Sequence, residues 1–307
     1  MNHLSSAPVW TPPPRACDAH FHIFGPVDRF PPGTANPRYA HPFAPLEEYL
    51  ALSAGLGIER FVFVQPSGYG RDNSCLLDAL QRVGSDRARG IVDIDEELPD
   101  AELDRMHALG VRGVRINLSP VHPFESGLLA AMMPRIERLA GRCAARGWHL
   151  DFLGPGWFTR ELLPSMRDVA VDFSVAHMGM FLASEGVQQP GVQELLDALR
   201  HGDGRCWVKL TGVYRMSTAP GFADAAPLAR AVIEAAPDRV IWGSDFPHLS
   251  FDTVDAVELF DLLGEWAPDE ATRRRIAVDN PARLYGFDEI ARGAEKRIGI
   301  DEEDRPQ

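Results

Sequence analysis

The chain has 307 residues, of which 45% are hydrophobic, and a formal net charge of −13 at pH 7. This length suits either two domains or one α/β barrel with a sizeable core. The acidic balance argues against nucleic acid and anionic membranes as partners, and it means that an acidic small-molecule substrate needs a local cluster of positive charge.

The cysteines and the chain ends indicate a soluble, cytoplasmic protein. Four scattered cysteines, without a Cys-x-x-Cys pair, are typical of reduced structural thiols: Cys17, Cys75, Cys143 and Cys206. Residues 1–15 are polar and proline-rich, so we expect an extended N-terminal arm and not a signal peptide. No apolar run approaches the roughly 20 residues of a membrane span. Residues 291–307 are expected to form an acidic, solvated tail. The sequence leaves open whether the chain forms a homo-oligomer.

The first predicted strand carries a His-x-His pair. It begins at Cys17, and Gly25-Pro26 ends it. Side chains alternate between the two faces of a strand, so His20 and His22 point the same way, with Asp18 behind them. Two imidazoles so placed are typical of a metal-binding or carbonyl-polarising pair, although ordinary polar residues at a strand end are the alternative.

Strands and helices alternate through the rest of the chain. Residues 30–45, rich in proline and glycine, cannot form a helix and are expected to fold over another part of the molecule. Seven further strands are predicted at 60–65, 89–94, 113–118, 148–153, 171–177, 206–211 and 239–245. Helices are predicted before them at 46–56, 73–83, 100–109, 128–146, 160–166, 192–200 and 227–236, and after them at 254–266, 269–278 and from 280. This alternation predicts a single-domain (β/α)8 TIM barrel over residues 16–290, and a doubly wound sheet is the alternative.

Polar residues recur at the carboxyl ends of the predicted strands, where barrels of this kind carry their working groups. They are His20, His22, Ser67, Arg115, Asn117, His177, Lys209, Tyr214, Arg215, Asp245 and His248. Three histidines and an aspartate can hold one divalent ion, or they can polarise a carbonyl while the aspartate takes a proton from water. The two arginines suit a substrate carboxylate. Each residue also has a structural interpretation, for example Lys209 as the partner of a carboxylate inside the barrel.

With these residues in place, the sequence resembles the amidohydrolase superfamily. Within it, the resemblance is to the branch of 2-pyrone-4,6-dicarboxylate lactonase-like hydrolases, from Cys17 to about Phe287. The motifs that carry it are DAHFHIFGP, QPSGYGRDN, RGVRINL, AHMG, VIWGSDFPH and NPARLYGF.

The resemblance implies roles for particular residues. His20, His22 and His177 would polarise a lactone carbonyl, and Asp245 would activate the hydrolytic water. Ser67, Arg115 and Arg215 would bind a substrate carboxylate, and the segment 30–45 would cover the site. We add Asn117, Tyr214 and His248 as substrate-binding residues from their positions at the same rim.

The sequence departs from the family pattern at three points. Leu153 replaces the tyrosine that the pyrone lactonase carries at the end of its fifth strand. Val121 stands where that enzyme has a second basic residue, and His122 is a candidate substitute. Both changes favour a substrate with one carboxylate or a sugar-like body. Metal-rich members use a lysine or glutamate on the fourth strand and a histidine on the fifth, which this chain lacks, so a binuclear centre is not expected.

The leading hypothesis is therefore a hydrolase that opens a carboxylated lactone in aromatic or sugar-acid catabolism. It needs either no cofactor or one zinc or manganese ion, which His20, His22, His177 and Asp245 would hold. The alternatives are a metal-dependent decarboxylase or hydratase of the same superfamily and a non-catalytic carboxylate-binding barrel.

Overall fold

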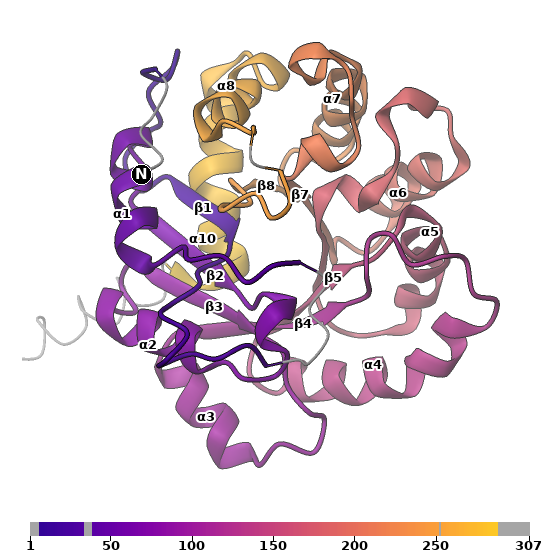
Figure 1. The fold of residues 1–307 in the computed structure, drawn as a ribbon. Coiled ribbons are helices and arrows are strands. Elements are labelled where there is room, and N and C mark those ends of the chain that lie inside the picture. Colours follow the sequence, from indigo (N-terminus) through magenta and orange to yellow (C-terminus); the bar gives the residue numbers. More distant parts are fainter. Residues whose placement is uncertain (1–5, 34–38, 252, 288–307) are drawn as a thin grey trace, which may run out of the picture.

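The computed structural model describes residues 6–33, 39–251 and 253–287, and it confirms the barrel (Figure 1). Eight parallel strands pair in chain order: β1 (Cys17–Phe21), β2 (Arg60–Val64), β3 (Ala88–Val92), β4 (Val111–Asn117), β5 (His149–Leu153), β6 (Phe173–Val175), β7 (Cys206–Leu210) and β8 (Val240–Trp242). Two backbone hydrogen bonds join the end of β1 to the residues that follow β8, from Asp245 N to His20 O and from His22 N to Phe246 O, each 2.8 Å long.

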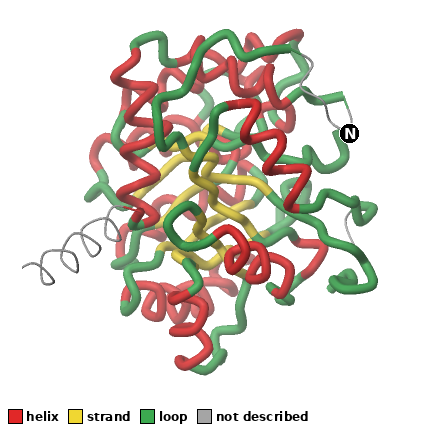
Figure 2. Tube along the Cα trace, turned by 90° about the vertical axis from the view of Figure 1, so that its left-hand side faces the viewer, coloured by secondary structure: helices red, strands yellow, loops and turns green. Residues whose placement is uncertain are grey.

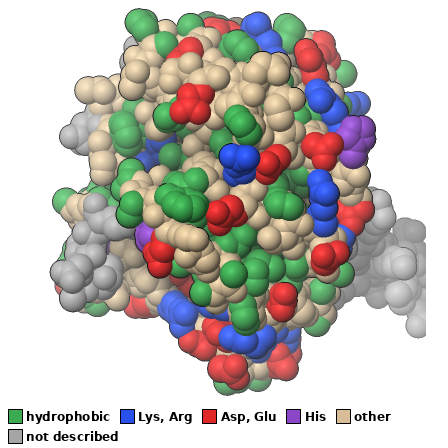
Figure 3. Space-filling view, turned by 90° about the vertical axis from the view of Figure 1, so that its right-hand side faces the viewer, with side chains coloured by type: hydrophobic (Ala, Val, Ile, Leu, Met, Phe, Trp, Pro, Cys, Tyr) green, Lys and Arg blue, Asp and Glu red, His purple; other side chains and the backbone are tan. Residues whose placement is uncertain are grey.

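Helices surround the strands, so that the sheet lies at the centre of the molecule (Figure 2). They are α1 (Leu46–Leu56), α2 (Ser74–Val83), α3 (Asp100–Ala108), α4 (Leu128–Ala144), α5 (Gly156–Ser165), α6 (Pro190–His201), α7 (Ala226–Ala235) and α8 (Ala256–Trp266), followed by α9 (Glu270–Arg274) and α10 (Asn280–Tyr285). On the face that carries α5 and α6, acidic and basic side chains are interspersed (Figure 3), and some form ion pairs, such as Arg160 with Glu194. No helix in the described ranges is both long and apolar enough to cross a membrane.

Two predicted strands are much shorter than expected, with three residues each, and the reason for their early ends is local. The predicted strands 171–177 and 239–245 end at Val175 and Trp242. His177 and Asp245 have φ angles of 52° and 58°, a left-handed conformation in which an extended strand cannot continue. The backbone therefore turns at the two positions where predicted site residues stand. The predicted helix 269–278 also divides, because a π-helical segment, Arg275–Asp279, follows α9.

The described part of the N-terminal arm packs on the barrel wall. The Trp10 ring stacks on Phe260 of α8 with the ring centroids 4.4 Å apart, and the Trp10 Nε1–H donates to the Phe260 carbonyl. In the predicted covering segment, the Tyr39 hydroxyl accepts a hydrogen bond from Gly68 N at 2.8 Å, so this residue lies over the loop after β2. The predicted acidic tail, 291–307, is outside the described residues.

Candidate active site

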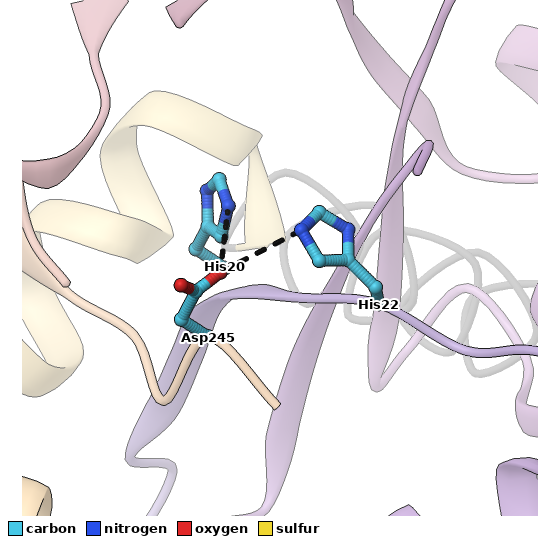
Figure 4. A group of neighbouring side chains, drawn as sticks. All are labelled: His20, His22 and Asp245. Carbon is cyan, nitrogen blue, oxygen red and sulfur yellow. Dashed lines mark ion pairs between the residues drawn. The ribbon is translucent and has the colours of Figure 1, made fainter. Parts of the chain in front are cut away.

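His20, in β1, and His22, just after it, converge on one aspartate (Figure 4). The Nε2 atoms of His20 and His22 each lie 3.6 Å from Oδ1 of Asp245, and all three side chains are buried. The strand alternation predicted that the two rings share a face, and the structure agrees. Gly243 permits the close approach of β8, because a Cβ there would lie 2.6 Å from the backbone N of His20.

Asp245 has one saturated and one open carboxylate oxygen. Its Oδ2 accepts hydrogen bonds from the Tyr214 hydroxyl at 2.5 Å and from Arg215 Nε at 3.0 Å. Its Oδ1 has no hydrogen-bond partner among the described residues. Burial alone would raise the pKa of Asp245, but the Arg215 guanidinium and the neighbouring imidazoles hold it well below its usual value. The carboxylate is therefore ionised at neutral pH, with one acceptor oxygen free.

His177 completes the group of imidazoles from the opposite side. Its ring centroid lies 5.2 Å from that of His20, and its Nε2 lies 3.9 Å from Oδ2 of Asp245. Its Nδ1 lies 2.7 Å from the Thr211 hydroxyl oxygen. Burial lowers the pKa of His177 to about 3 and also lowers the pKa values of His20 and His22. All three rings are consequently neutral near pH 7.

Three of the four predicted metal ligands have donor atoms that could hold one ion. One donor atom from each of His20, His22 and Asp245 lies within 4.8 Å of the others, and Nε2 of His20 and Oδ1 of Asp245 have no partner in the described part of the chain. Two imidazole nitrogens and a carboxylate oxygen are an ordinary ligand set for a first-row divalent ion. These atoms therefore fit one ion in position, whereas His177 faces the other carboxylate oxygen.

A cavity of about 260 Å³ opens beside this group. Of the residues predicted to bind substrate or catalyse, its wall includes His22, Ser67, Arg115, Asn117, His177, Arg215 and Asp245. Its apolar lining residues include Val121, Leu153, Met180, Leu249 and Phe251. The wall thus combines charged and polar groups with apolar side chains.

Arg115 is the cavity's buried cation with spare donors. Its side chain is 3% exposed, and its Nη1 donates to the Gln65 carbonyl at 3.0 Å. Its Nε has no hydrogen-bond partner within the described ranges. Arg215, by contrast, already binds Asp245 and stacks its guanidinium over the Tyr214 ring at 5.0 Å. An anionic group that enters the cavity would therefore meet Arg115 as its main unsatisfied partner.

Two predicted substrate-binding residues lie behind the cavity wall. Tyr214 turns its hydroxyl to Asp245, and Nε2 of His248 lies 3.2 Å from the Ser244 carbonyl oxygen. Both side chains are buried, and neither lines the cavity. Their place in the sequence next to Arg215 and Asp245 predicted proximity to the site, but not the direction in which their side chains point.

The sequence reasoning gave no role in the site to several residues that shape it. Tyr39 lines the cavity from the 30–45 segment, and Thr211 contacts His177. Asp18 accepts hydrogen bonds from the backbone N–H groups of His20 and Ser244, and thereby ties β1 to the residue before Asp245. A threonine directly after a strand that ends at the rim was the available signal for Thr211; nothing in the sequence singled out Tyr39.

The chain matches known proteins over nearly its whole length. The amidohydrolase family model matches residues 17–287. The chain belongs to the amidohydrolase family. The sequence of this amidohydrolase is 37% identical over 287 residues to the 4-sulfomuconolactone hydrolase of Hydrogenophaga intermedia, covering 92% of this chain and 91% of that protein. It is 33% identical over 298 residues to a 2-pyrone-4,6-dicarboxylate hydrolase of Comamonas testosteroni, with 93% and 94% covered.

The fold of this amidohydrolase is also shared with solved structures. An apo structure from Agrobacterium tumefaciens matches it with a TM-score of 0.79 and 28% identity, covering 91% of this chain and 98% of that chain. The expected resemblance to the amidohydrolase superfamily, close to the pyrone-dicarboxylate hydrolases, is confirmed. The named relatives are hydrolases of cyclic esters, as the leading hypothesis expected.

Proposed function

We propose that this amidohydrolase opens a carboxylated lactone by attack of water on the ester carbonyl. The observation that carries the proposal is the meeting of three neutral imidazoles with one ionised carboxylate, beside a cavity that contains an incompletely paired arginine. The hydrolases named among its relatives act on substrates of this class, which supports the proposal.

In this reaction, Asp245 is the base that takes a proton from the attacking water. Its Oδ1 is the open acceptor, because Tyr214 and Arg215 occupy Oδ2. As the water oxygen bonds to the carbonyl carbon, the carbonyl oxygen becomes an oxyanion, which imidazole N–H groups stabilise. Collapse of this intermediate breaks the ring C–O bond, and the leaving oxygen takes the proton from Asp245. The product then carries one more carboxylate than the substrate.

The mixed polar and apolar lining of the cavity favours a substrate with a single acidic substituent. Arg115 and Ser67 offer donors to that substituent, whereas Leu153, Met180 and Phe251 offer apolar contact to the rest of the molecule. A second anionic group in contact with these apolar residues would lose its hydration without gaining a partner. The preferred lactone therefore carries one carboxylate or an equivalent anion.

A zinc or manganese ion on His20, His22 and Asp245 would polarise the carbonyl oxygen and lower the pKa of a bound water. The same residues would then serve as its ligands, while Arg115 would still bind the acidic substituent. A decarboxylase or hydratase would need such an ion firmly held. A carboxylate-binding protein would need only Arg115. Under that hypothesis, the arrangement of histidines around Asp245 has no role.

Turnover of a lactone panel tests the proposal. The purified protein is incubated with lactones that carry no, one or two acidic substituents, and acid release is followed at constant pH beside a metal analysis of the same sample. We expect turnover, fastest for one acidic substituent. Tight binding without turnover would favour the binding protein, and stoichiometric metal with decarboxylation or hydration, but no acid release, would favour the alternative enzyme.

A further inference from the structure

A buried ion pair lies inside the barrel next to His20, and the proposed reaction does not use it. Nζ of Lys209 lies 2.7 Å from Oδ1 of Asp151, and both side chains are fully buried. The Ser174 hydroxyl donates to the same carboxylate oxygen at 2.6 Å. Burial raises the pKa of Asp151 and lowers that of Lys209, and the close contact between the two groups opposes both shifts. Lys209 and Arg115 hold the pKa of Asp151 at about 2, so the carboxylate is ionised, and an ammonium is the form of Lys209 that pairs with it.

The same ammonium faces His20. Nζ of Lys209 lies 3.4 Å from Nδ1 of His20. An ammonium has three N–H donors and no lone pair, so the nitrogen that it contacts must supply the lone pair. In the neutral His20 ring, the proton is consequently on Nε2, the nitrogen that faces Asp245.

His22 has the opposite environment. Its Nδ1 lies 2.8 Å from the carbonyl oxygen of Val64, which only accepts hydrogen bonds. The His22 proton is therefore on Nδ1, and Nε2 presents a lone pair to the site. Two histidines that look equivalent in the sequence thus present different groups at equal distances from Oδ1 of Asp245.

We propose that Lys209 is a positioning residue that keeps the ring proton of His20 on Nε2, so that His20 is a hydrogen-bond donor in the site while His22 is an acceptor. The inference rests on the proposed function for its consequence: His20 would donate to the carbonyl oxygen, and His22 together with Asp245 would accept the hydrogens of the attacking water. It gives the two imidazoles separate tasks.

The same contact acts against a metal ion. An ion on Nε2 of His20 requires the ring proton to move to Nδ1, where it would face the Lys209 ammonium. Metal-binding histidines ordinarily direct this second N–H to a carboxylate or a carbonyl, as His22 does. Lys209 therefore weakens ion binding at His20, His22 and Asp245 while leaving their positions intact.

Nitrogen NMR of the histidine side chains tests the tautomers directly. In protein with 15N-labelled histidine at neutral pH, assigned with His20→Asn and His22→Asn, we expect the His20 proton on Nε2 and the His22 proton on Nδ1. The inference is overturned if His20 carries its proton on Nδ1 or if both rings show the same tautomer. This readout needs no turnover, so it stays decisive even if the protein opens no lactone.

Zinc affinity of a paired variant tests the role of Lys209. In Lys209→Met/Asp151→Leu the ion pair is replaced by apolar side chains, and we expect zinc to bind about tenfold to a hundredfold more tightly than in the wild type. A merely structural role predicts the opposite sign, because a loosened site binds zinc more weakly; unchanged or weaker binding by folded variant protein overturns the assignment. Ser174→Ala, which keeps Lys209 and Asp151, is the matched control and should bind zinc like the wild type.

Discussion

Two buried arginines on neighbouring strands have opposite surroundings. Arg89 on β3 donates to the carbonyl oxygens of Tyr285 and Gly286 at 2.8 Å each, and its guanidinium lies 4.3 Å from the centroid of the Phe287 ring. Arg115 on β4 has a partner at the Gln65 carbonyl, and its Nε faces none among the described residues. Arg89 fastens the end of the described chain to the barrel, whereas Arg115 faces a cavity. Burial alone therefore does not identify a functional cation; unsatisfied donors beside a cavity do.

The largest effect is expected at the open carboxylate oxygen of the site. Asp245→Asn removes the acceptor of the water proton, and kcat/KM for the best lactone should fall by about a thousandfold. The control is Asp172→Asn, because Asp172 accepts a hydrogen bond from the Trp207 indole outside the cavity. A fall in kcat/KM of less than tenfold in Asp245→Asn would contradict the role of Asp245 as the base.

Replacement of Arg89 or Arg115 by methionine tests whether the two arginines have the different roles that their surroundings indicate. Arg89→Met leaves buried carbonyl oxygens without donors, so the free energy of unfolding should drop by about 3 kcal/mol in denaturant titrations, with kcat/KM retained per folded molecule. Arg115→Met should show the reverse, a rise in KM by about 10- to 100-fold with unfolding changed by about 1 kcal/mol or less. Equal effects of the two substitutions on KM would abolish the distinction.

Acid should destabilise the protein through histidines at both ends of the barrel. Burial lowers the pKa of His177, at the cavity, to about 3 and that of His149, at the start of β5, to about 4, from the usual 6.5. Between these pKa values, the two histidines bind protons in the unfolded chain but not in the folded chain. The free energy of unfolding should thus fall as the pH drops from about 6.5 towards 4, by about 1.4 kcal/mol per pH unit for each group.

Asp18 changes the free energy of unfolding with pH in the opposite direction to the two histidines. Burial raises its pKa from 3.8 to about 6, so between these values the folded state holds the extra proton and stability falls as the pH rises. Urea unfolding at a series of pH values measures the combined contribution of these groups to the free energy of unfolding. His149→Gln should reduce the slope by about one group's share and leave turnover intact; an unchanged slope would contradict a neutral, buried His149.

The smallest effect is expected at the hydroxyl that orients His177. Thr211→Val removes the group 2.7 Å from Nδ1 of His177, and kcat should fall about fivefold, which corresponds to the loss of one hydrogen bond of about 1 kcal/mol. Thr211→Ser keeps the hydroxyl and should retain the wild-type kcat. If both variants lose activity equally, the methyl packing of Thr211 matters and its hydrogen bond does not.

The sequence itself determined the barrel and the neighbourhood of the site. Apolar runs alternating with helices can bury their strands in only a few ways, so the eight strands were predictable, and the polar residues at their carboxyl ends had to gather at one rim. The alternation of side chains along the first predicted strand likewise placed His20 and His22 on one face. These conclusions depend on local periodicity, which the chain carries in its residue order.

Only the tertiary structure decided which partner each polar atom meets. Arg215 and Tyr214 turn to Asp245, and Lys209 faces both Asp151 and His20 across the barrel interior. These contacts join residues far apart in the sequence, and they depend on strand register and on positive φ angles that no local pattern specifies. Hydrogen-bond partners set the tautomer and the charge of a buried group, so the chemistry of the site is determined by contacts that only the folded chain makes.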